Sequence, residues 1–145
     1  MEIRDINVKT IQEIKAGDVA FFSKTIMEAD TQIFAMISGD YAPHHVNRAF
    51  GKTTMYHGSI AHGMLTVGLL APVLNKLCGD NSLTSSEEVR FRSAVVLNDT
   101  VTVRGEVTQV DLEEKKVTVD IVCRKQGAPE DERPYIIGTV VQELF

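Results

Sequence analysis

The sequence predicts an α+β fold in which a curled antiparallel sheet wraps around one long buried helix. Two observations carry this prediction. Between His62 and Leu77 nearly every position is apolar, and a helix that is apolar on all sides must be buried on all sides. From residue 89 onward, apolar and polar residues alternate with a period of two, which is typical of antiparallel strands with one buried face. A sheet curled around the helix brings both sets of apolar side chains into one core.

The composition is that of one globular domain, which we expect to span residues 1–145. Of the 145 residues, 43% are hydrophobic and 24% are charged, and a chain of this length buries a sufficient core without disulfides or metals. The 20 acidic residues outnumber the 15 Lys and Arg residues, which gives a net charge of −5. This charge argues against broad binding to nucleic acid. No apolar run approaches the ~20 residues that a membrane span needs.

The cysteines and the start of the chain indicate a cytoplasmic protein. Cys78 and Cys123 lie in separate apolar segments without CxxC spacing, so we expect two buried, reduced thiols. Residues 1–5 lack the basic and then apolar layout of a signal peptide.

The first third of the chain predicts one strand, one short helix and a long connection. Residues 19–27 contain strand-forming apolar residues. Asp30 or Thr31 can cap a helix whose apolar positions follow at helical spacing, and Gly39 ends it. Residues 40–61 are expected to be an irregular connection, and they contain three of the four histidines.

The rest of the chain predicts the central helix and the sheet. Pro72 should kink or loosen the helix over residues 62–77. Strands are expected around residues 89–92, 101–108, 117–124 and 135–141, with a hairpin tip at residues 111–116. The predicted arrangement is a hot-dog fold. Because a curled sheet of this size leaves an edge strand unpaired, we expect a homodimer or a higher homo-oligomer.

Asp40, His45 and Gly63 are the candidates for chemistry. Asp40 and His45 are five residues apart around Pro43, and a carboxylate and an imidazole held close together can bind one water and exchange a proton with it near neutral pH. Gly63 lies at the start of the predicted helix, where a free backbone N–H can stabilise developing negative charge.

Two motifs then resemble a known family. The run Ser38–His45 followed by Ala61–Met64 resembles the signature of (R)-specific enoyl-CoA hydratases and the wider MaoC-like dehydratases, and the resemblance extends over residues 12–145. It implies a hot-dog fold and reversible syn hydration of a trans-2-enoyl-CoA to the (R)-3-hydroxyacyl-CoA. The coenzyme A thioester is then the substrate, and no further cofactor is needed.

The resemblance also assigns roles to residues. Asp40 and His45 match the catalytic pair, and Gly63 matches the glycine whose N–H polarises the thioester carbonyl. We therefore expect His62, Gly63 and Met64 at the substrate-binding site. His45 is our choice for the general base, with Asp40 orienting the water and returning the proton, although these two roles can be exchanged.

Three positions depart from the family pattern. Ala42 stands where the family usually has Asn, and His44 replaces an aliphatic residue. Ala71 stands where some members have a serine, so no role of that serine is transferred to this chain. Loss of the Asn amide removes one or two hydrogen bonds, each worth about 0.5–1.5 kcal/mol.

Other readings of these residues remain open. The histidines with Asp40 can be read as a metal cluster, but the sequence has no compact HExxH or CxxC pair, so we expect no metal. A nucleophilic triad using Ser38 or Ser59 lacks the GxSxG elbow.

Two alternative functions and one alternative binding site also remain open. Hot-dog proteins also include acyl-CoA thioesterases, and a non-catalytic acyl-CoA-binding protein is the alternative from another class. Arg90, Arg92 and Arg104 alternate out of the predicted sheet. We expect them to be solvated, and the alternative is that they bind the phosphates of coenzyme A.

Overall fold

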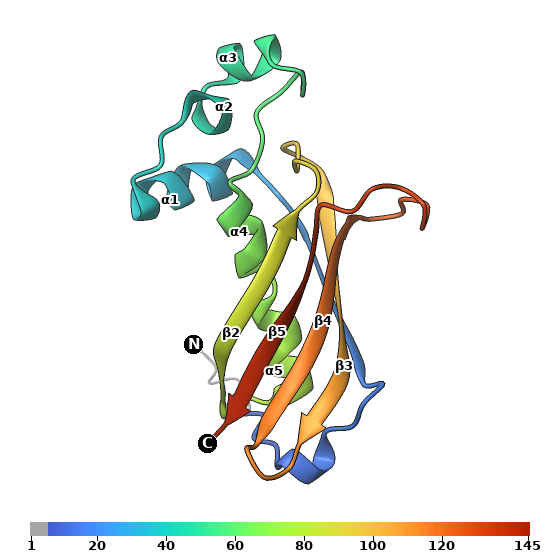
Figure 1. The fold of residues 1–145 in the computed structure, drawn as a ribbon. Helices are drawn as coiled ribbons and strands as arrows, with labels where there is room; N and C mark the ends of the chain where they lie inside the picture. Colours follow the sequence, from blue (N-terminus) through green and yellow to red (C-terminus); the bar gives the residue numbers. More distant parts are fainter. Residues whose placement is uncertain (1–5) are drawn as a thin grey trace.

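A five-stranded antiparallel sheet curls around a pair of helices (Figure 1). The structure, a computed structural model, describes residues 6–145. The strand order is β1-β3-β4-β5-β2, with every pair antiparallel. The strands are β1 (Val19–Thr25), β2 (Ser82–Phe91), β3 (Thr100–Asp111), β4 (Lys116–Lys125) and β5 (Ile136–Leu144). The helices are the 3-10 turn η1 (Ile11–Glu13), α1 (Glu28–Ser38), α2 (Pro43–Val46), α3 (Arg48–Thr53), α4 (Gly63–Gly68) and α5 (Ala71–Cys78). The hot-dog prediction is confirmed.

The core lies between the concave face of the sheet and α5. Alternate residues of β3 and β4 point inward and are fully or almost fully buried, among them Val103 and Val119. Gly105 in the middle of β3 allows α5 to lie close to the sheet, because a Cβ at this position would be 2.6 Å from Cγ1 of Val73. The period-two pattern therefore predicted the buried face correctly.

The single helix predicted over residues 62–77 is divided into two segments, α4 and α5. After Gly68 the chain makes two tight turns, in which the N–H groups of Leu69 and Leu70 bond to carbonyls three residues earlier. A new helix then begins at Ala71, with Pro72 in its first turn. Proline is tolerated there because an N–H in the first turn has no helical acceptor, whereas inside a continuous helix its ring would collide with the preceding turn.

The prediction that this helix is buried on all sides is wrong. One face of α4 and α5 is exposed, including Met64 at 58%, and a groove of about 370 Å³ separates it from β2. The edge strand β2 is exposed along most of its length, with Leu83 at 66%. An apolar sequence predicts that a surface will be covered, but it does not tell whether residues of the same chain or of a second molecule cover it.

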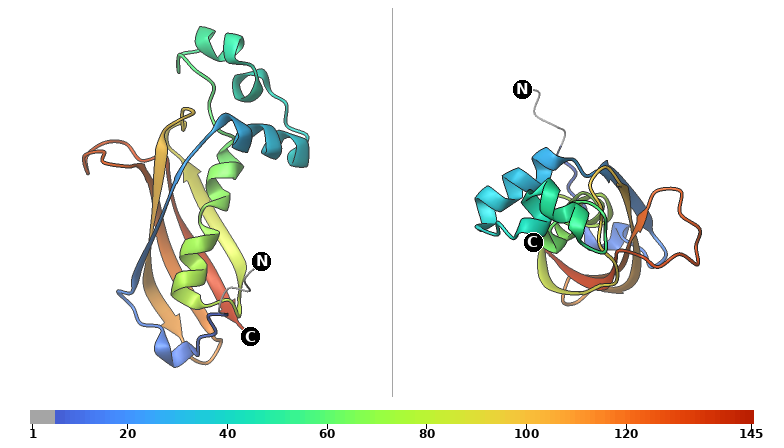
Figure 2. Two further views of the ribbon diagram at one scale, coloured as in Figure 1. Left: turned by 180° about the vertical axis from the view of Figure 1, so that it is seen from behind. Right: turned by 90° about the horizontal axis from the view of Figure 1, so that it is seen from above.

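The segment between β1 and α4 also differs from expectation. Helix α1 starts at Glu28, and the Asp30 carboxylate accepts the N–H of Met27 from within the first turn. Gly39 ends α1 as predicted, with φ of 76°, in the left-handed region that glycine adopts without strain. The connection over residues 40–61 contains α2 and α3, which are too short to produce a periodic apolar pattern. Helices α1, α2 and α3 lie beyond the end of the sheet, next to the start of α4 (Figures 1 and 2).

Both cysteines are free and buried, as predicted. Burial raises the pKa of the Cys78 thiol to about 11 and that of the Cys123 thiol to about 12, so both thiols stay protonated near neutral pH. Within residues 6–145, none of the helices combines the length and apolar character needed to cross a bilayer. The prediction about a signal peptide concerns residues 1–5, which lie outside the described residues.

Candidate active site

Asp40 is placed by the end of α1. After Gly39 turns the chain, the backbone N–H of Asp40 donates to Oγ of Ser38 at 3.2 Å. Its carboxylate Oδ1 accepts the N–H of Ala42 at 3.1 Å. The side chain is 51% exposed, so this carboxylate is oriented by local hydrogen bonds and is still accessible to water.

His45 lies on α2 and is 8% exposed. Its Nδ1 is 2.9 Å from the backbone carbonyl of Ile60. A carbonyl can only accept, so Nδ1 carries the hydrogen, and in the neutral ring Nε2 has a free lone pair. Burial, as the largest effect, together with neighbouring imidazoles, lowers the pKa of His45 below its ordinary value, which favours this neutral form.

The free nitrogen of His45 faces Asp40. Nε2 is 3.8 Å from Oδ2 of the Asp40 carboxylate, too far for a direct hydrogen bond. Both atoms are acceptors when His45 is neutral, so they do not satisfy each other. A donor with two hydrogens, such as water, fits between them.

His62 packs directly against this pair. Its ring stacks on the His45 ring with a centroid distance of 3.9 Å and an interplanar angle of 24°. The Phe34 ring lies on His62 at 4.8 Å. Nε2 of His62 is 2.9 Å from the backbone carbonyl of Asp40, so the three predicted polar residues form one cluster.

Gly63 begins α4 next to this cluster. Its N–H is the first of the helix and has no acceptor within it. Gly63 lines a pocket of about 380 Å³. A Cβ at Gly63 would lie 2.7 Å from Cε1 of Phe91, so a larger residue here requires this ring to move. The lining residues are Phe34, Ser38, Asp40, His62, Gly63, Met64 and Phe91.

The structure brings the predicted site residues together, with one difference in their access. Asp40, His62, Gly63 and Met64 line the pocket. His45 does not line it; its Nε2 faces the carboxylate of Asp40, which does. Sequence analysis missed the apolar wall made by Phe34 and Phe91 and the carbonyl of Ile60 that sets the His45 tautomer. These contacts come from separate segments, and no local pattern marks them.

The cluster also brings together three side chains that are potential metal ligands. One ligand atom each from Asp40, His45 and His62 lies within 4.8 Å of the others. The two imidazoles are stacked, however, so their in-plane lone pairs lie in nearly parallel planes and do not converge on one point at the ~2.0–2.1 Å that zinc requires. The geometry suits hydrogen bonding better, and the absence of a metal stays a prediction.

Neither serine of the alternative triad has a histidine partner among residues 6–145. Oγ of Ser38 donates to the carbonyl of Phe34 at 2.7 Å. Oγ of Ser59 is buried without a hydrogen-bond partner in the described part of the chain. No base therefore activates either hydroxyl for nucleophilic attack.

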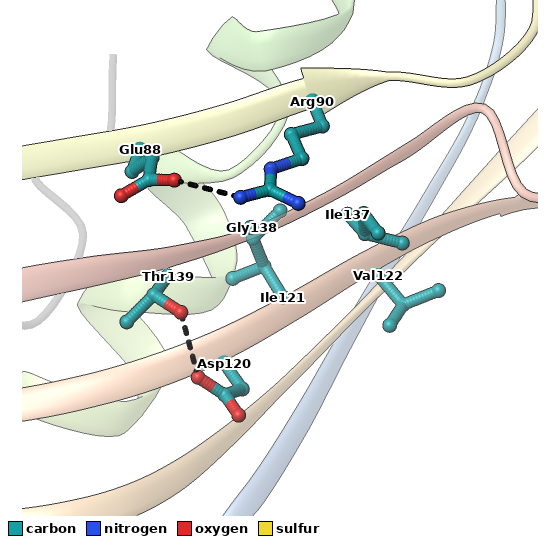
Figure 3. A pocket seen from close by; sticks show the side chains of 8 residues that line it. All are labelled: Glu88, Arg90, Asp120, Ile121, Val122, Ile137, Gly138 and Thr139. Carbon is teal, nitrogen blue, oxygen red and sulfur yellow. Dashed lines mark hydrogen bonds and ion pairs between the residues drawn. The ribbon is translucent and has the colours of Figure 1, made fainter.

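A second hollow, of about 340 Å³, lies on the outer face of the sheet (Figure 3). Its charged residues form exposed local pairs: Arg90 with Glu88 at 3.4 Å, and Thr139 donating to Asp120 at 2.9 Å. Arg90 is 71% exposed, in agreement with the prediction of a solvated side chain. The binding of coenzyme A phosphates by these arginines stays an untested alternative.

Comparison with known proteins places this chain in a family. The sequence profile described as "MaoC like domain" matches residues 11–126. An (R)-specific enoyl-CoA hydratase from Rhodospirillum rubrum is 36% identical over 128 residues, which cover 88% of this chain and 89% of that protein. A 3-hydroxybutyryl-CoA dehydratase from Methylorubrum extorquens is 30% identical and covers 82% of this chain and 76% of its own.

Solved structures agree with the sequence matches. The (R)-hydratase from Aeromonas caviae involved in PHA biosynthesis superposes with a TM-score of 0.86 at 30% identity, covering 92% of this chain and 99% of that one. An unliganded R-hydratase from Pseudomonas aeruginosa also gives a TM-score of 0.86, at 26% identity, covering 96% of this chain and 87% of that chain.

Proposed function

The chain belongs to the MaoC-like family of hydratases and dehydratases, and we propose that it reversibly hydrates trans-2-enoyl-CoA to (R)-3-hydroxyacyl-CoA. The observation that carries this proposal is the 3.8 Å gap between Nε2 of His45 and Oδ2 of Asp40, beside the pocket that contains Gly63. The family's reaction needs a base, an acid and an N–H donor near one bound water, and these residues supply all of them.

The gap has the right size for one water molecule. A water oxygen at ordinary hydrogen-bond distance, ~2.8 Å, from both acceptors can donate one hydrogen to each. At the 3.8 Å separation the two acceptors subtend about 85° at the water oxygen, so each hydrogen bond bends by roughly 10° from linear, which is within the preferred range. The two lone pairs of the water oxygen then point away from the two acceptors, and the Asp40 carboxylate that would hold this water also lines the pocket with Gly63.

In the hydration direction this water attacks C3 of the enoyl thioester. As the C3–O bond forms, one water proton moves to Nε2 of His45, and the other stays in the new hydroxyl. The electrons of the double bond move onto the thioester oxygen as an enolate. A proton then returns from the Asp40–His45 pair to C2, so that one water is added and the pair is restored.

The N–H of Gly63 stabilises the enolate oxygen. Helix α4 has only six residues, so its dipole is small and the contribution is that of one directed hydrogen bond. Removing one such donor typically lowers kcat by about 10²–10³-fold. Two residues flank Gly63 in the pocket wall. Met64 is exposed and would contact the substrate near its thioester, whereas His62 is 2% exposed and packs against His45. No cofactor beyond the coenzyme A thioester is required.

The proposal is tested with purified protein and crotonyl-CoA. We expect loss of the enoyl absorbance without release of thiol, measured in parallel with Ellman's reagent. His45→Asn should abolish this loss, because the Asn amide can still donate to the Ile60 carbonyl but offers no base at the position of Nε2. His57→Asn is the matched control: His57 has φ of 54°, a conformation in which Asn is favoured.

The same assay separates the two rivals. Thiol release with loss of the thioester identifies an acyl-CoA thioesterase. Saturable binding of acyl-CoA without any chemical change, even at high protein concentration, identifies a non-catalytic binding protein. Failure to turn over any short or medium enoyl-CoA contradicts the hydratase.

The exposed edge supports a homodimer as part of the proposed function. β2 is an edge of the sheet, with unpaired backbone groups on one side. Beside it lie the exposed apolar side chains of Met64 and Leu83. Pairing of β2 with β2 of a second copy would cover both. Light scattering on the eluting protein should then give twice the 16.0 kDa chain mass, and the single-chain mass contradicts it.

The cytoplasm is the compartment we propose. Cys78 and Cys123 are both buried and free of disulfides in the structure, which supports it, because disulfides are rare in the cytosol. Detection of the protein in a secreted or periplasmic fraction contradicts this assignment.

A further inference from the structure

His62 connects the two groups of the proposed acid–base pair. Its ring is 2% exposed and lies between the rings of Phe34 and His45. Its Nε2 is 2.9 Å from the backbone carbonyl of Asp40. One buried side chain therefore contacts the main chain of the carboxylate residue and the ring face of the imidazole that opposes it.

The hydrogen bond to Asp40 fixes the protonation of His62. Because the carbonyl can only accept, Nε2 carries the hydrogen, and Nδ1 of the neutral ring is an acceptor. This Nδ1 is buried and has no hydrogen-bond partner within residues 6–145. A buried polar atom without a partner is unfavourable for folding. An apolar side chain of similar size would avoid this, so packing alone does not account for an imidazole here.

The contacts among His62, Asp40 and His45 form a closed loop. The Asp40 carbonyl accepts from His62, His62 stacks on His45, and Nε2 of His45 faces the Asp40 carboxylate across the 3.8 Å gap. His62 also directly precedes Gly63 in the chain. A shift of the His62 ring would therefore change the gap and the position of the pair relative to the Gly63 N–H.

We propose that His62 is a positioning residue: its Nε2–H and its ring face hold Asp40 and His45 at the separation that admits one water, in register with the Gly63 amide. This inference rests on the proposed function. His62 acts through Asp40 and His45, so its loss should lower kcat and change KM little. A misplacement of 1 Å can cost about 100-fold in rate.

Three substitutions at one position test this role. In His62→Gln the side-chain amide nitrogen can reach the place of Nε2 and donate to the Asp40 carbonyl, whereas in His62→Asn it reaches only the place of Nδ1. His62→Leu keeps the volume and removes both nitrogens. We expect the Gln variant to retain kcat within about fivefold, and the Asn and Leu variants to lose about 10–100-fold in kcat with KM within about twofold.

Thermal unfolding separates positioning from stability. The Leu variant should unfold at the same temperature as the natural protein or higher, because it removes the unpartnered Nδ1. Full activity in the Leu variant, or equal losses in the Gln and Leu variants, overturns the proposal. So does a loss of kcat no larger than the loss of folded protein.

Imidazole nitrogen NMR keeps this test independent of activity. Spectra of the natural protein should show hydrogen on Nε2 of His62 and on Nδ1 of His45, and His62→Leu should shift the His45 signals while those of His57 stay in place. Hydrogen on Nδ1 of His62, or unchanged His45 signals, overturns the positioning role. If the natural protein hydrates no enoyl-CoA but these spectra are as expected, the proposed function fails and the positioning of the pair stands.

Discussion

Two hollows of similar size, one beside the start of α4 and one on the outer face of the sheet, differ in what surrounds their polar groups. The candidate pocket, about 380 Å³ in volume, has two buried imidazoles beside its carboxylate. The outer hollow, about 340 Å³, has a carboxylate and a guanidinium, Glu88 and Arg90, that are 79% and 71% exposed (Figure 3). Size and the presence of a carboxylate therefore do not distinguish the two.

The difference lies in orientation and desolvation. In the outer hollow each charged group is hydrated, so its interaction with a neighbour is weak and its geometry is loose. In the candidate pocket, the Ile60 and Asp40 carbonyls each fix one imidazole tautomer, and burial keeps His45 neutral. In the candidate pocket, therefore, backbone carbonyls fix the orientation of the imidazoles, and burial keeps other water molecules from binding to them.

Asp40→Asn should have the largest effect. The Asn side chain can still accept the N–H of Ala42, so the fold should persist, but it neither exchanges a proton nor accepts one from water. We expect kcat for crotonyl-CoA hydration to fall by about 10²–10⁴-fold with little change in the unfolding temperature.

Asp120→Asn is the matched control in the outer hollow, where the carboxylate accepts from Thr139. It should leave kcat unchanged. An equal loss of kcat in the two variants would contradict the proposed difference between the two hollows.

Gly63→Ala should have the next largest effect. The added methyl group would lie 2.7 Å from the Phe91 ring, and this ring is 53% exposed and can move. Stability should therefore change little, whereas the methyl group restricts approach to the N–H and should lower kcat/KM by about 10–100-fold. Adding Phe91→Ala relieves the collision. If that double variant regains full activity, displacement of the ring explains the loss, and restricted approach to the N–H does not.

The pH profile should show the depressed pKa of His45. The base must be neutral, so kcat/KM should fall with acidification at a midpoint below pH 6.5, the ordinary histidine value. Stability should change with the same sign. Below that value the unfolded chain binds the proton more readily than the folded one, so the free energy of unfolding decreases as pH falls through this window. A midpoint above 6.5 in the kcat/KM profile contradicts a buried neutral base.

Arg90→Gln should have the smallest effect. It breaks the exposed pair with Glu88, and such pairs contribute little, so the free energy of unfolding should change by about 0.5 kcal/mol or less. Urea titration measures this change. A decrease in crotonyl-CoA affinity would instead reveal that the arginine contacts coenzyme A.

The sequence predicts the features of the molecule that depend on residues close together in the chain. Period-two alternation identifies the faces of β3 and β4. The spacing of Asp40 and His45 makes them candidates, and the family resemblance of the same short segment assigns them as a pair. The Asp40–His62 hydrogen bond joins residues 22 apart in the chain, and the Phe91–Gly63 contact joins a strand to a helix. Only the folded arrangement makes such contacts, so the tautomers and the pocket wall were not predictable.

The exposed face of α4 and α5 shows a second limit. The run over residues 62–77 is apolar, but Met64 remains exposed. A sequence pattern reports that a surface is apolar and cannot say which chain covers it. The break before Pro72 was predicted as a kink because proline acts locally, and only its extent needed the structure.

Hydration of crotonyl-CoA in D₂O measures the central arrangement most directly. If the imidazole and the carboxylate serve one bound water, oxygen and deuterium must reach C3 and C2 from the same face. The coupling between the remaining C2 and C3 protons of the product should then show a single, syn diastereomer of the (R)-3-hydroxy thioester. An anti product, or deuterium on both faces of C2, would contradict the account.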